Sequence, residues 1–250
     1  MDGQAWPREL ELYRAEAAIA ARLPAAVPAP RLLGTHDDGR WTILAFDHVD
    51  GAEPARPWVA ADLDRVVRAA GRLARAVTPS PIRLPRDHPR LGGWADLASD
   101  EPRLARLRAA CPWAADNLGR LVALENEGLA AAAGDSLVHF DLYPHNILLT
   151  RDDVVFVDWP HARLGAPVLD LICVLSSAAA DGLDPEPYLL RAAGHPPAEP
   201  RAVDAILSAH AGFLLAGAVT RMPPGLEPIA AAKLHLGVGA ARWLRQRLFR

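Results

Sequence analysis

Three side chains that could bind a cation or move a proton, Asp141, Asn146 and Asp158, stand around two short apolar runs. The sequence is HFDLYPHN over residues 139–146, then ILL and VVFV separated by a polar turn, and then Asp158-Trp159. Amide and carboxylate oxygens suit Mg²⁺, which usually takes its other ligands from water and substrate phosphates. A carboxylate beside such a cation can orient a hydroxyl group and accept its proton. These residue types therefore predict metal-assisted chemistry on a hydroxyl group.

The two apolar runs predict a tight β-hairpin, because the polar sequence TRDD at residues 150–153 is typical of a turn. In an antiparallel hairpin the start of one arm lies beside the end of the other, which places Asn146 next to Asp158. Asp141 lies on the loop that enters the hairpin. We therefore expect Asn146 and Asp158 to share a cation, with Asp141 facing the same space without binding it.

The elements that must position this hairpin follow from patterning along the rest of the chain. A helix is predicted from Pro7 to a stop at Pro24, then two antiparallel strands on either side of Asp38-Gly39, closed by Gly51. Asp62 is predicted to cap the next helix. The proline-rich stretch 78–94 predicts a loop, and residues 101–134 and 166–250 are mostly helical in pattern. The expected fold is a small mixed lobe joined to a larger helical one.

Composition limits the classes of partner. The chain has 250 residues, 51% of them hydrophobic, and a formal net charge of −3, which supplies no basic field for nucleic acid or an anionic membrane surface. No apolar stretch is long enough to span a membrane, and the start has no secretory pattern. Cys111 and Cys173 show no framework spacing, so we interpret them as reduced, buried thiols. We expect a cytoplasmic protein that binds neither nucleic acid nor membrane.

The motif H-x-D-x-x-x-x-N, followed by an apolar hairpin and D-W, resembles the aminoglycoside phosphotransferase family. These are small-molecule kinases related in fold to protein kinases. The resemblance implies an α+β, protein-kinase-like fold with a truncated mixed lobe at residues 1–50 and a hinge near 46–51. The helical lobe would span residues 51–250, with the catalytic loop at 139–146 and the metal segment at 156–170.

The resemblance assigns a role to each residue of the motif. Asp141 becomes the catalytic base, and Asn146 and Asp158 become the ligands of Mg²⁺. His139 would brace the loop. Asp170, in GAPVLDL, matches a family aspartate that ties the catalytic loop to the following helix, which is a structural role.

The resemblance extends to the nucleotide side. Glu16, in YRAEAAIAARL, is similar to the family glutamate that pairs with a phosphate-binding lysine, although a solvated helix residue remains the alternative. Backbone groups near Asp47 and Val49 would hydrogen-bond the adenine, with Leu148 and Val157 packed beneath it. The implied cofactors are Mg²⁺ and ATP or another nucleoside triphosphate.

The implied activity is transfer of the γ-phosphoryl group of ATP to a hydroxyl of a small molecule. The alternative is a catalytically inactive, kinase-like binding module. The last fifty residues carry more basic than acidic side chains, which argues against a polycationic aminoglycoside as the substrate. Nothing in the sequence selects among other alcohols.

One part of the family pattern is missing from this sequence. No glycine-rich loop and no lysine strand precede Glu16, and the sole lysine is Lys233. Three explanations stay open: an omitted N-terminal segment, a short form with weak or no catalysis, and a partner chain that completes the lobe. We favour a truncated or short-form kinase, because Asp141, Asn146 and Asp158 are all present. The two strands would then leave an open sheet edge, which predicts a homodimer through this lobe.

Overall fold

The computed structural model describes residues 7–84, 91–192 and 199–249. Among these residues, no helix combines the length and the apolar character that crossing a membrane requires. The elements are α1 (Pro7–Ala20), β1 (Leu32–Asp37), β2 (Thr42–Phe46), α2 (Ala60–Ala76), α3 (Trp94–Ala98), α4 (Glu101–Ala110), α5 (Pro112–Asp116), α6 (Leu118–Ala131), β3 (Ser136–Val138), η1 (Pro144–Asn146), β4 (Ile147–Leu149), β5 (Val154–Phe156), β6 (Arg163–Gly165), α7 (Val168–Ala180), α8 (Glu186–Ala192), α9 (Pro200–Ala218) and α10 (Glu227–Leu248).

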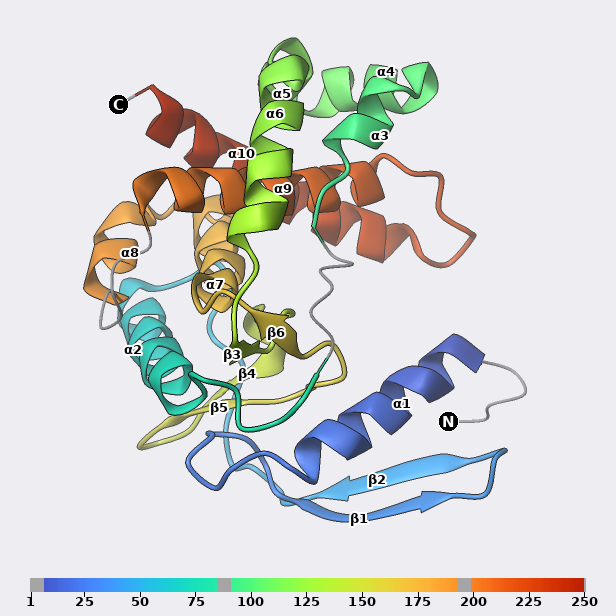
Figure 1. Ribbon diagram of the computed structural model, residues 1–250, viewed down its shortest axis with the longest axis vertical. Coiled ribbons are helices and arrows are strands. Elements are labelled where there is room, and N and C mark those ends of the chain that lie inside the picture. The colour runs from blue at the N-terminus through green and yellow to red at the C-terminus, as the bar shows by residue number, and fades with distance from the viewer. Residues whose placement is uncertain (1–6, 85–90, 193–198, 250) are drawn as a thin grey trace.

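The N-terminal helix and hairpin form as the sequence predicts. Strands β1 and β2 pair antiparallel, with Asp37 opposite Thr42, and α1 lies along the hairpin (Figure 1). The turn contains Gly39 at φ 84°, a conformation that glycine adopts without strain. The carboxylate of Asp38 accepts the N–H groups of Arg40 and Trp41 at 2.9 and 2.7 Å, which closes the turn.

The predicted cap of α2 is wrong. The helix begins at Ala60, after Val59, and Asp62 lies in its first turn. The carboxylate of Asp62 accepts the N–H of Ala55 at 3.5 Å, a group of the preceding loop. An acidic side chain in this position still stabilises the helix, because it faces the positive end of the helix dipole. Of the proline-rich stretch that predicts a loop, residues 85–90 lie outside the described part of the chain.

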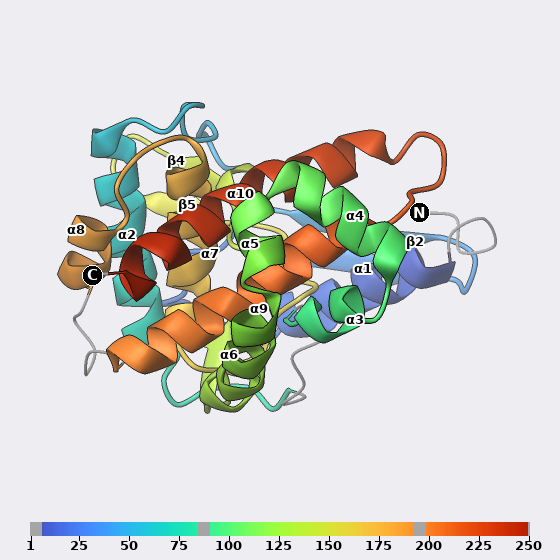
Figure 2. The same cartoon turned by 90° about the horizontal axis from the view of Figure 1, so that it is seen from above.

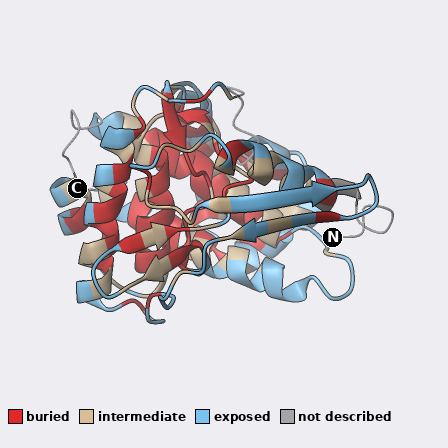
Figure 3. Cartoon of the chain, turned by 90° about the horizontal axis from the view of Figure 1, so that it is seen from below, coloured by how far each residue is buried: buried red, intermediate tan, exposed pale blue. Residues whose placement is uncertain are grey.

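The larger part of the molecule is a bundle in which α9 lies between α6 and α10 (Figure 2). Buried residues concentrate in these helices and in α7, whereas the hairpin is largely exposed (Figure 3). Two tryptophans, Trp94 and Trp243, are fully buried there. The helices approach closely at glycines: a Cβ on Gly128 of α6 would lie 2.1 Å from the carbonyl oxygen of Ala205 in α9.

Gly128→Ala is expected to lower the free energy of unfolding by about 1–3 kcal/mol, because the added methyl group forces α6 away from α9. Gly119→Ala is the matched control in the same helix, since a Cβ there meets nothing within 4 Å. That substitution is expected to stabilise the protein by about 0.5–1 kcal/mol through helix propensity. Urea denaturation of both variants measures the difference. Equal stabilities would contradict the close approach of the two helices.

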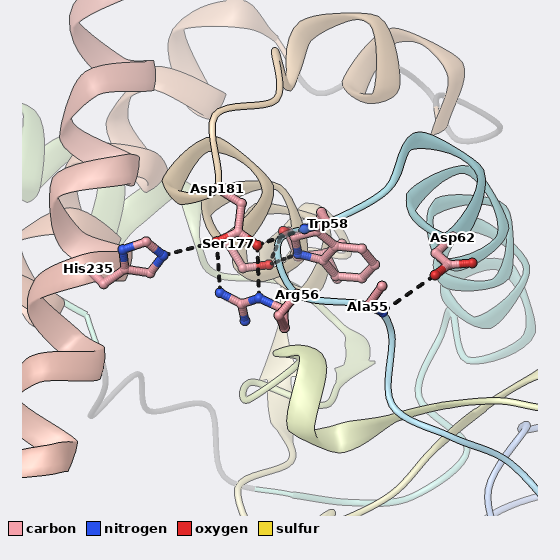
Figure 4. Close-up of polar contacts among 8 residues, drawn as sticks. Ala55, Arg56, Trp58, Asp62, Ser177, Asp181 and His235 are labelled. Carbon is pink, nitrogen blue, oxygen red and sulfur yellow. Dashed lines mark hydrogen bonds and ion pairs between the residues drawn. The ribbon is translucent and has the colours of Figure 1, made fainter.

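The segment between the hairpin and α2 is fastened to the helical bundle by Asp181 (Figure 4). Its carboxylate accepts two hydrogen bonds from the guanidinium of Arg56, at 2.8 and 3.0 Å, and one from the backbone N–H of Trp58 at 2.9 Å. His235 of α10 lies 3.0 Å from the same carboxylate. The indole of Trp58 donates to Ser177 Oγ at 2.8 Å. Residues 56–58 are therefore bound to α7 and α10.

Candidate active site

The predicted hairpin after the catalytic motif is confirmed. Strands β4 and β5 pair antiparallel, with Ile147 opposite Phe156, and the N–H of Val157 donates to the carbonyl of Asn146 at 3.0 Å. Helix α2 contacts the turn between β4 and β5, because the guanidinium of Arg65 donates to the carbonyls of Thr150 and Asp153. The backbone therefore brings Asn146 beside the residues that lead into Asp158.

Asn146 lies in contact with Asp141. Its Nδ2 atom donates to the backbone carbonyl of Asp141 at 2.8 Å and to the carboxylate Oδ2 at 3.3 Å. The side chain is buried, with 2% of the residue exposed. Because the amide nitrogen faces Asp141, the amide oxygen is the atom that remains to meet a cation. These contacts bring two of the three predicted residues together.

Two residues at the site have a left-handed backbone, although neither is glycine. Phe140, directly before Asp141, has φ 68°, and Asp158 has φ 65°. Such conformations cost about 1–3 kcal/mol and persist only where the surrounding structure holds them. Asp158 is exposed, so its carboxylate can be reached by a ligand. The strain therefore lies at the two positions that aim the predicted base and the predicted cation ligand.

His139 and Asp170 hold the loop that carries Asp141. The Nε2 of His139 lies 2.9 Å from the carbonyl of Val157, and its ring packs against Trp159 at 4.6 Å between centroids. The carboxylate of Asp170 accepts the backbone N–H groups of His139 and Phe140, each at 2.9 Å. Burial raises the pKa of Asp170, although these hydrogen bonds and nearby His139 oppose the shift. Both residues occupy the positions that bracing the loop requires.

A cleft of about 460 Å³ opens between α1, the end of the β1–β2 hairpin and the β4–β5 hairpin. Asp158 lies on its wall, so the predicted nucleotide residues and a predicted cation ligand surround one space. The residues predicted for the nucleotide all line this cleft: Glu16, Asp47, Val49, Leu148 and Val157.

Glu16 lies in this cleft close to Asp158. Burial and the negative charge of Asp158 raise the pKa of Glu16 from 4.5 to about 7, and a hydrogen bond from the backbone of Trp159 opposes the shift. Two carboxyl groups therefore face one another where a nucleotide and its cation would bind. The sole lysine is elsewhere: Lys233 lies on α10 with its ammonium 5.0 Å from the ring centre of Phe213.

Glu16→Gln is expected to raise the melting temperature of the nucleotide-free protein at pH 8, and to raise it much less near pH 5. A carboxyl group whose pKa is raised in the folded state destabilises that state as pH rises from 4.5 to about 7, and the neutral amide removes this effect. Thermal unfolding between pH 5 and pH 8 measures the difference between variant and parent.

Glu11→Gln is the matched control, because Glu11 is an exposed carboxylate on the same helix. A similar pH-dependent gain in the control would assign the effect to the charge of α1 in general. A difference for Glu16→Gln that stays constant with pH would contradict a raised pKa at this position.

Beside Asp141 lie residues to which the sequence analysis assigned no role in the site. Tyr143, Cys173 and His210 surround a hollow of about 10 Å³, enough for about one water molecule. The Nε2 of His210 lies 3.3 Å from the Tyr143 hydroxyl. Burial lowers the pKa of His210 to about 4, although Asp141 opposes the shift, so the imidazole is neutral at pH 7. The sequence feature that could have indicated His210 is a single histidine within the apolar stretch ILSAHAGFLL.

A second hollow of about 410 Å³ adjoins the first, because Leu91 and Phe213 line both. Two carboxylates, those of Asp96 and Glu125, lie on its wall with Arg103. Glu125 is buried and accepts the backbone N–H of Trp94 at 2.8 Å. This hollow gives the space beside Asp141 a polar extension.

Comparison with solved structures places the chain among small-molecule kinases in fold. A choline/ethanolamine kinase family protein from Mesorhizobium loti has a TM-score of 0.63 at 17% identity, covering 95% of this chain and 83% of its own. The aminoglycoside phosphotransferase from Alicyclobacillus acidocaldarius subsp. acidocaldarius DSM 446 has a TM-score of 0.61 at 17% identity, covering 95% and 81%. A spectinomycin phosphotransferase, solved with ADP and spectinomycin, has a TM-score of 0.62 at 11% identity, covering 96% and 84%.

The chain thus has the protein-kinase-like fold of these phosphotransferases and kinases. A search of the curated proteins found no match to this sequence. The phosphotransferase enzyme family, however, matches residues 2–206, and the chain belongs to this family. The resemblance inferred from the catalytic motif is thereby confirmed.

Proposed function

We propose that this protein transfers the γ-phosphoryl group of ATP to a hydroxyl group of a small molecule, with Mg²⁺ as cofactor. The observation that supports the proposal is the contact between Asn146 and Asp141, together with the backbone hydrogen bond from Val157 to Asn146, which brings the neighbouring Asp158 toward them. Asp158 also lines the cleft of about 460 Å³. The incomplete lysine pattern remains the argument for the alternative, an inactive kinase-like binding module.

The donor set suits Mg²⁺. Asn146 and Asp158 supply one amide and one carboxylate oxygen, and within the described ranges no group of three or more His, Cys, Asp or Glu side chains is arranged to hold a metal ion. A cation held by two protein ligands takes the rest from phosphates and water, as Mg²⁺ prefers. When bound, it would neutralise charge on the phosphates. Asn146 and Asp158 are thus the residues that would hold it.

Asp141 is the proposed base. Its carboxylate is held by the amide of Asn146, and its backbone by the loop that Asp170 fixes. A hydroxyl group placed beside it would donate its proton to the carboxylate as the oxygen attacks the phosphorus in line with the leaving group. Most of the catalytic effect in this class of reaction comes from such positioning and from electrostatic stabilisation.

The acceptor would enter from the side of Phe213, where the small hollow at Asp141 meets the larger one with Asp96 and Glu125. Two carboxylates there are compatible with an alcohol that also carries a positively charged nitrogen, as choline and ethanolamine do, and one structural relative is a choline/ethanolamine kinase family protein. The basic excess of the last fifty residues still disfavours a large polycation.

Two measurements test the proposal. A thermal-shift titration with ATP, with and without Mg²⁺, is expected to show stabilisation that grows with ligand concentration and requires the cation for its full size. Asp158→Asn is expected to remove the Mg²⁺-dependent part. ADP release is then followed with a panel of choline, ethanolamine and spectinomycin. Nucleotide binding without ADP release on a broad alcohol panel favours the binding module. No thermal shift at millimolar ATP contradicts the phosphotransferase and favours a module that does not bind nucleotide, or an incomplete fragment.

We also propose that the chain forms a homodimer through the β1–β2 hairpin. The described sheet at this end contains only two strands, and three of its apolar residues are exposed: Leu33 at 56%, Trp41 at 44% and Ile43 at 57%. An open sheet edge with apolar side chains tends to pair with another chain. Sedimentation velocity of the parent and of Ile43→Lys tests this. A parent that stays monomeric at high concentration removes the proposal.

A further inference from the structure

A second large cavity, of about 790 Å³, lies apart from the nucleotide cleft. Helices α2, α7 and α8 surround it together with the start of α9 and the end of α10, in the region at the left of Figure 1. Among the described residues, none lines both this cavity and the cleft of about 460 Å³ that contains Glu16 and Asp158. Its volume falls within the range of small-molecule sites, which is about 300–1,000 Å³.

The walls of this cavity are mostly apolar. Helix α2 contributes Ala70, Gly71 and Ala74, whose small side chains leave room between this helix and α8. Leu189 and Leu190 of α8 face the space from the other side, and Leu190 is 73% exposed. A ligand that covered such a leucine would remove apolar surface from water, which favours binding.

The charged groups on the wall have an acidic excess. Asp170, Glu186 and Glu199 line the cavity, against a single described basic residue, Arg247. The guanidinium of Arg247 donates to Glu186 at 2.7 Å and also to Asp204, so the charges of Arg247 and Glu186 offset one another. The carboxyl groups of Asp170 and Glu199 remain on the wall. A negative wall disfavours fatty acids and phosphates and favours a ligand with a positive charge.

The cavity also touches the support of the catalytic loop. Pro167, Val168 and Asp170 form part of its wall, and the carboxylate of Asp170 accepts the N–H groups of His139 and Phe140. These two residues directly precede Asp141 in the chain. A ligand packed against the start of α7 would therefore contact Asp170, which is hydrogen-bonded directly to the loop that carries the proposed base.

We propose that this cavity binds an apolar small molecule carrying a protonated amine, and that occupancy steadies the catalytic loop through Asp170. The binding half is independent of the proposed phosphotransferase reaction. The effect on the catalytic loop concerns the mobility of residues 139–146, which can be measured without substrate.

Isothermal titration of the full chain with n-decylamine, n-decanol and decanoate tests the binding, with the two ionic compounds below their micelle concentrations and decanol below its solubility limit. Decylamine is expected to bind one site about tenfold more tightly than decanol, because the two differ only in the charged group, and decanoate is expected to bind least. Ala74→Phe fills the cavity and is expected to weaken decylamine by at least about tenfold. Ala61→Phe, at an exposed position of the same helix, is the matched control.

A second variant covers the case in which Ala74→Phe does not fold. Glu199→Gln removes an exposed carboxylate at the cavity and is expected to reduce the preference for decylamine over decanol while leaving decanol unchanged. No saturable binding of decylamine, binding equal in the Ala74→Phe and Ala61→Phe variants, or decanoate binding most tightly would each overturn the site.

Hydrogen exchange tests the coupling to the loop. Saturating decylamine is expected to slow exchange of the amides of His139 and Phe140, which donate to Asp170, and to leave those of the distant hairpin residues Arg40 and Trp41 unchanged. Binding without slower exchange at residues 139–140 overturns the coupling, and it leaves the proposed phosphotransferase activity to be judged by its own assays.

Discussion

Asp141→Asn is expected to lower the rate of phosphoryl transfer by about 10²–10⁴-fold, the range attributed to a positioned general base. The amide has nearly the shape of the carboxylate but does not accept a proton at neutral pH. Asp141 is only partly buried, and the hydrogen bond from Asn146 to its backbone carbonyl remains in the variant. The folded structure and the binding of ATP with Mg²⁺ are therefore expected to persist, because Asn146 and Asp158 are unchanged.

The measurement is ADP release with an accepting alcohol, alongside the melting temperature with and without ATP and Mg²⁺. Asp152→Asn is the matched control, since this aspartate is exposed in the turn between β4 and β5. The control is expected to retain full activity. Full activity in Asp141→Asn would refute the role of Asp141 as the base, whereas a large fall in the control would show that the assay reports general damage.

Asp170→Ala is expected to lower the free energy of unfolding by about 2–5 kcal/mol. Its buried carboxylate accepts two backbone N–H groups, and each buried donor left without an acceptor costs about 1–3 kcal/mol. Transfer activity is also expected to fall, because the same two hydrogen bonds hold the residues before Asp141. Urea denaturation measures the stability, and ADP release at a temperature where the variant remains folded measures the activity.

Asp170→Asn removes only one of the two hydrogen bonds, because its amide oxygen can still accept one of the two N–H groups. We expect its stability to lie between those of the parent and of Asp170→Ala. Asp116→Ala, at an exposed position of α5, is the surface control and is expected to change stability by less than about 0.5 kcal/mol. An Asp170→Ala protein as stable as this control would show that the two backbone groups find other partners.

Much of the fold could be predicted because local patterns were strong and agreed with one another. The Asp38-Gly39 turn, the polar turn at residues 150–153 and the apolar periodicity of the helices each predict an element that the structure contains. The start of α2 was predicted wrongly because an aspartate near a helix N-terminus can either cap the helix or hydrogen-bond the preceding loop. Asp62 hydrogen-bonds the preceding loop instead of capping the helix, and sequence alone does not distinguish these arrangements.

Spacing alone brought site residues together only where they are close in sequence, whereas the family resemblance also supplied Glu16, Asp47 and Val49. Asp141, Asn146 and Asp158 belong to one loop and hairpin, so spacing and strand pairing were enough to bring them together. His210 and Glu125 reach the same region from α9 and α6 through helix packing, which no local pattern encodes. The pKa of Glu16 likewise depends on burial and on Asp158, which lies far away in the sequence.

The anchoring of the chain after the hairpin determines where the molecule can bend. The N–H of Asp47 donates to the carbonyl of Arg31, the residue before β1, and Ala52 exchanges two backbone hydrogen bonds with Leu149. Asp181 fixes the residues that follow. The carbonyl of Pro28 also accepts the N–H of Phe156 in β5 at 2.7 Å, so a rotation of α1 and its hairpin against the helices would turn about this hydrogen bond and about residues 48–51. Two of these residues, His48 and Val49, line the cleft of about 460 Å³. A ligand bound in this cleft would contact α1 on one side and the β4–β5 hairpin on the other, and it would therefore restrict the rotation.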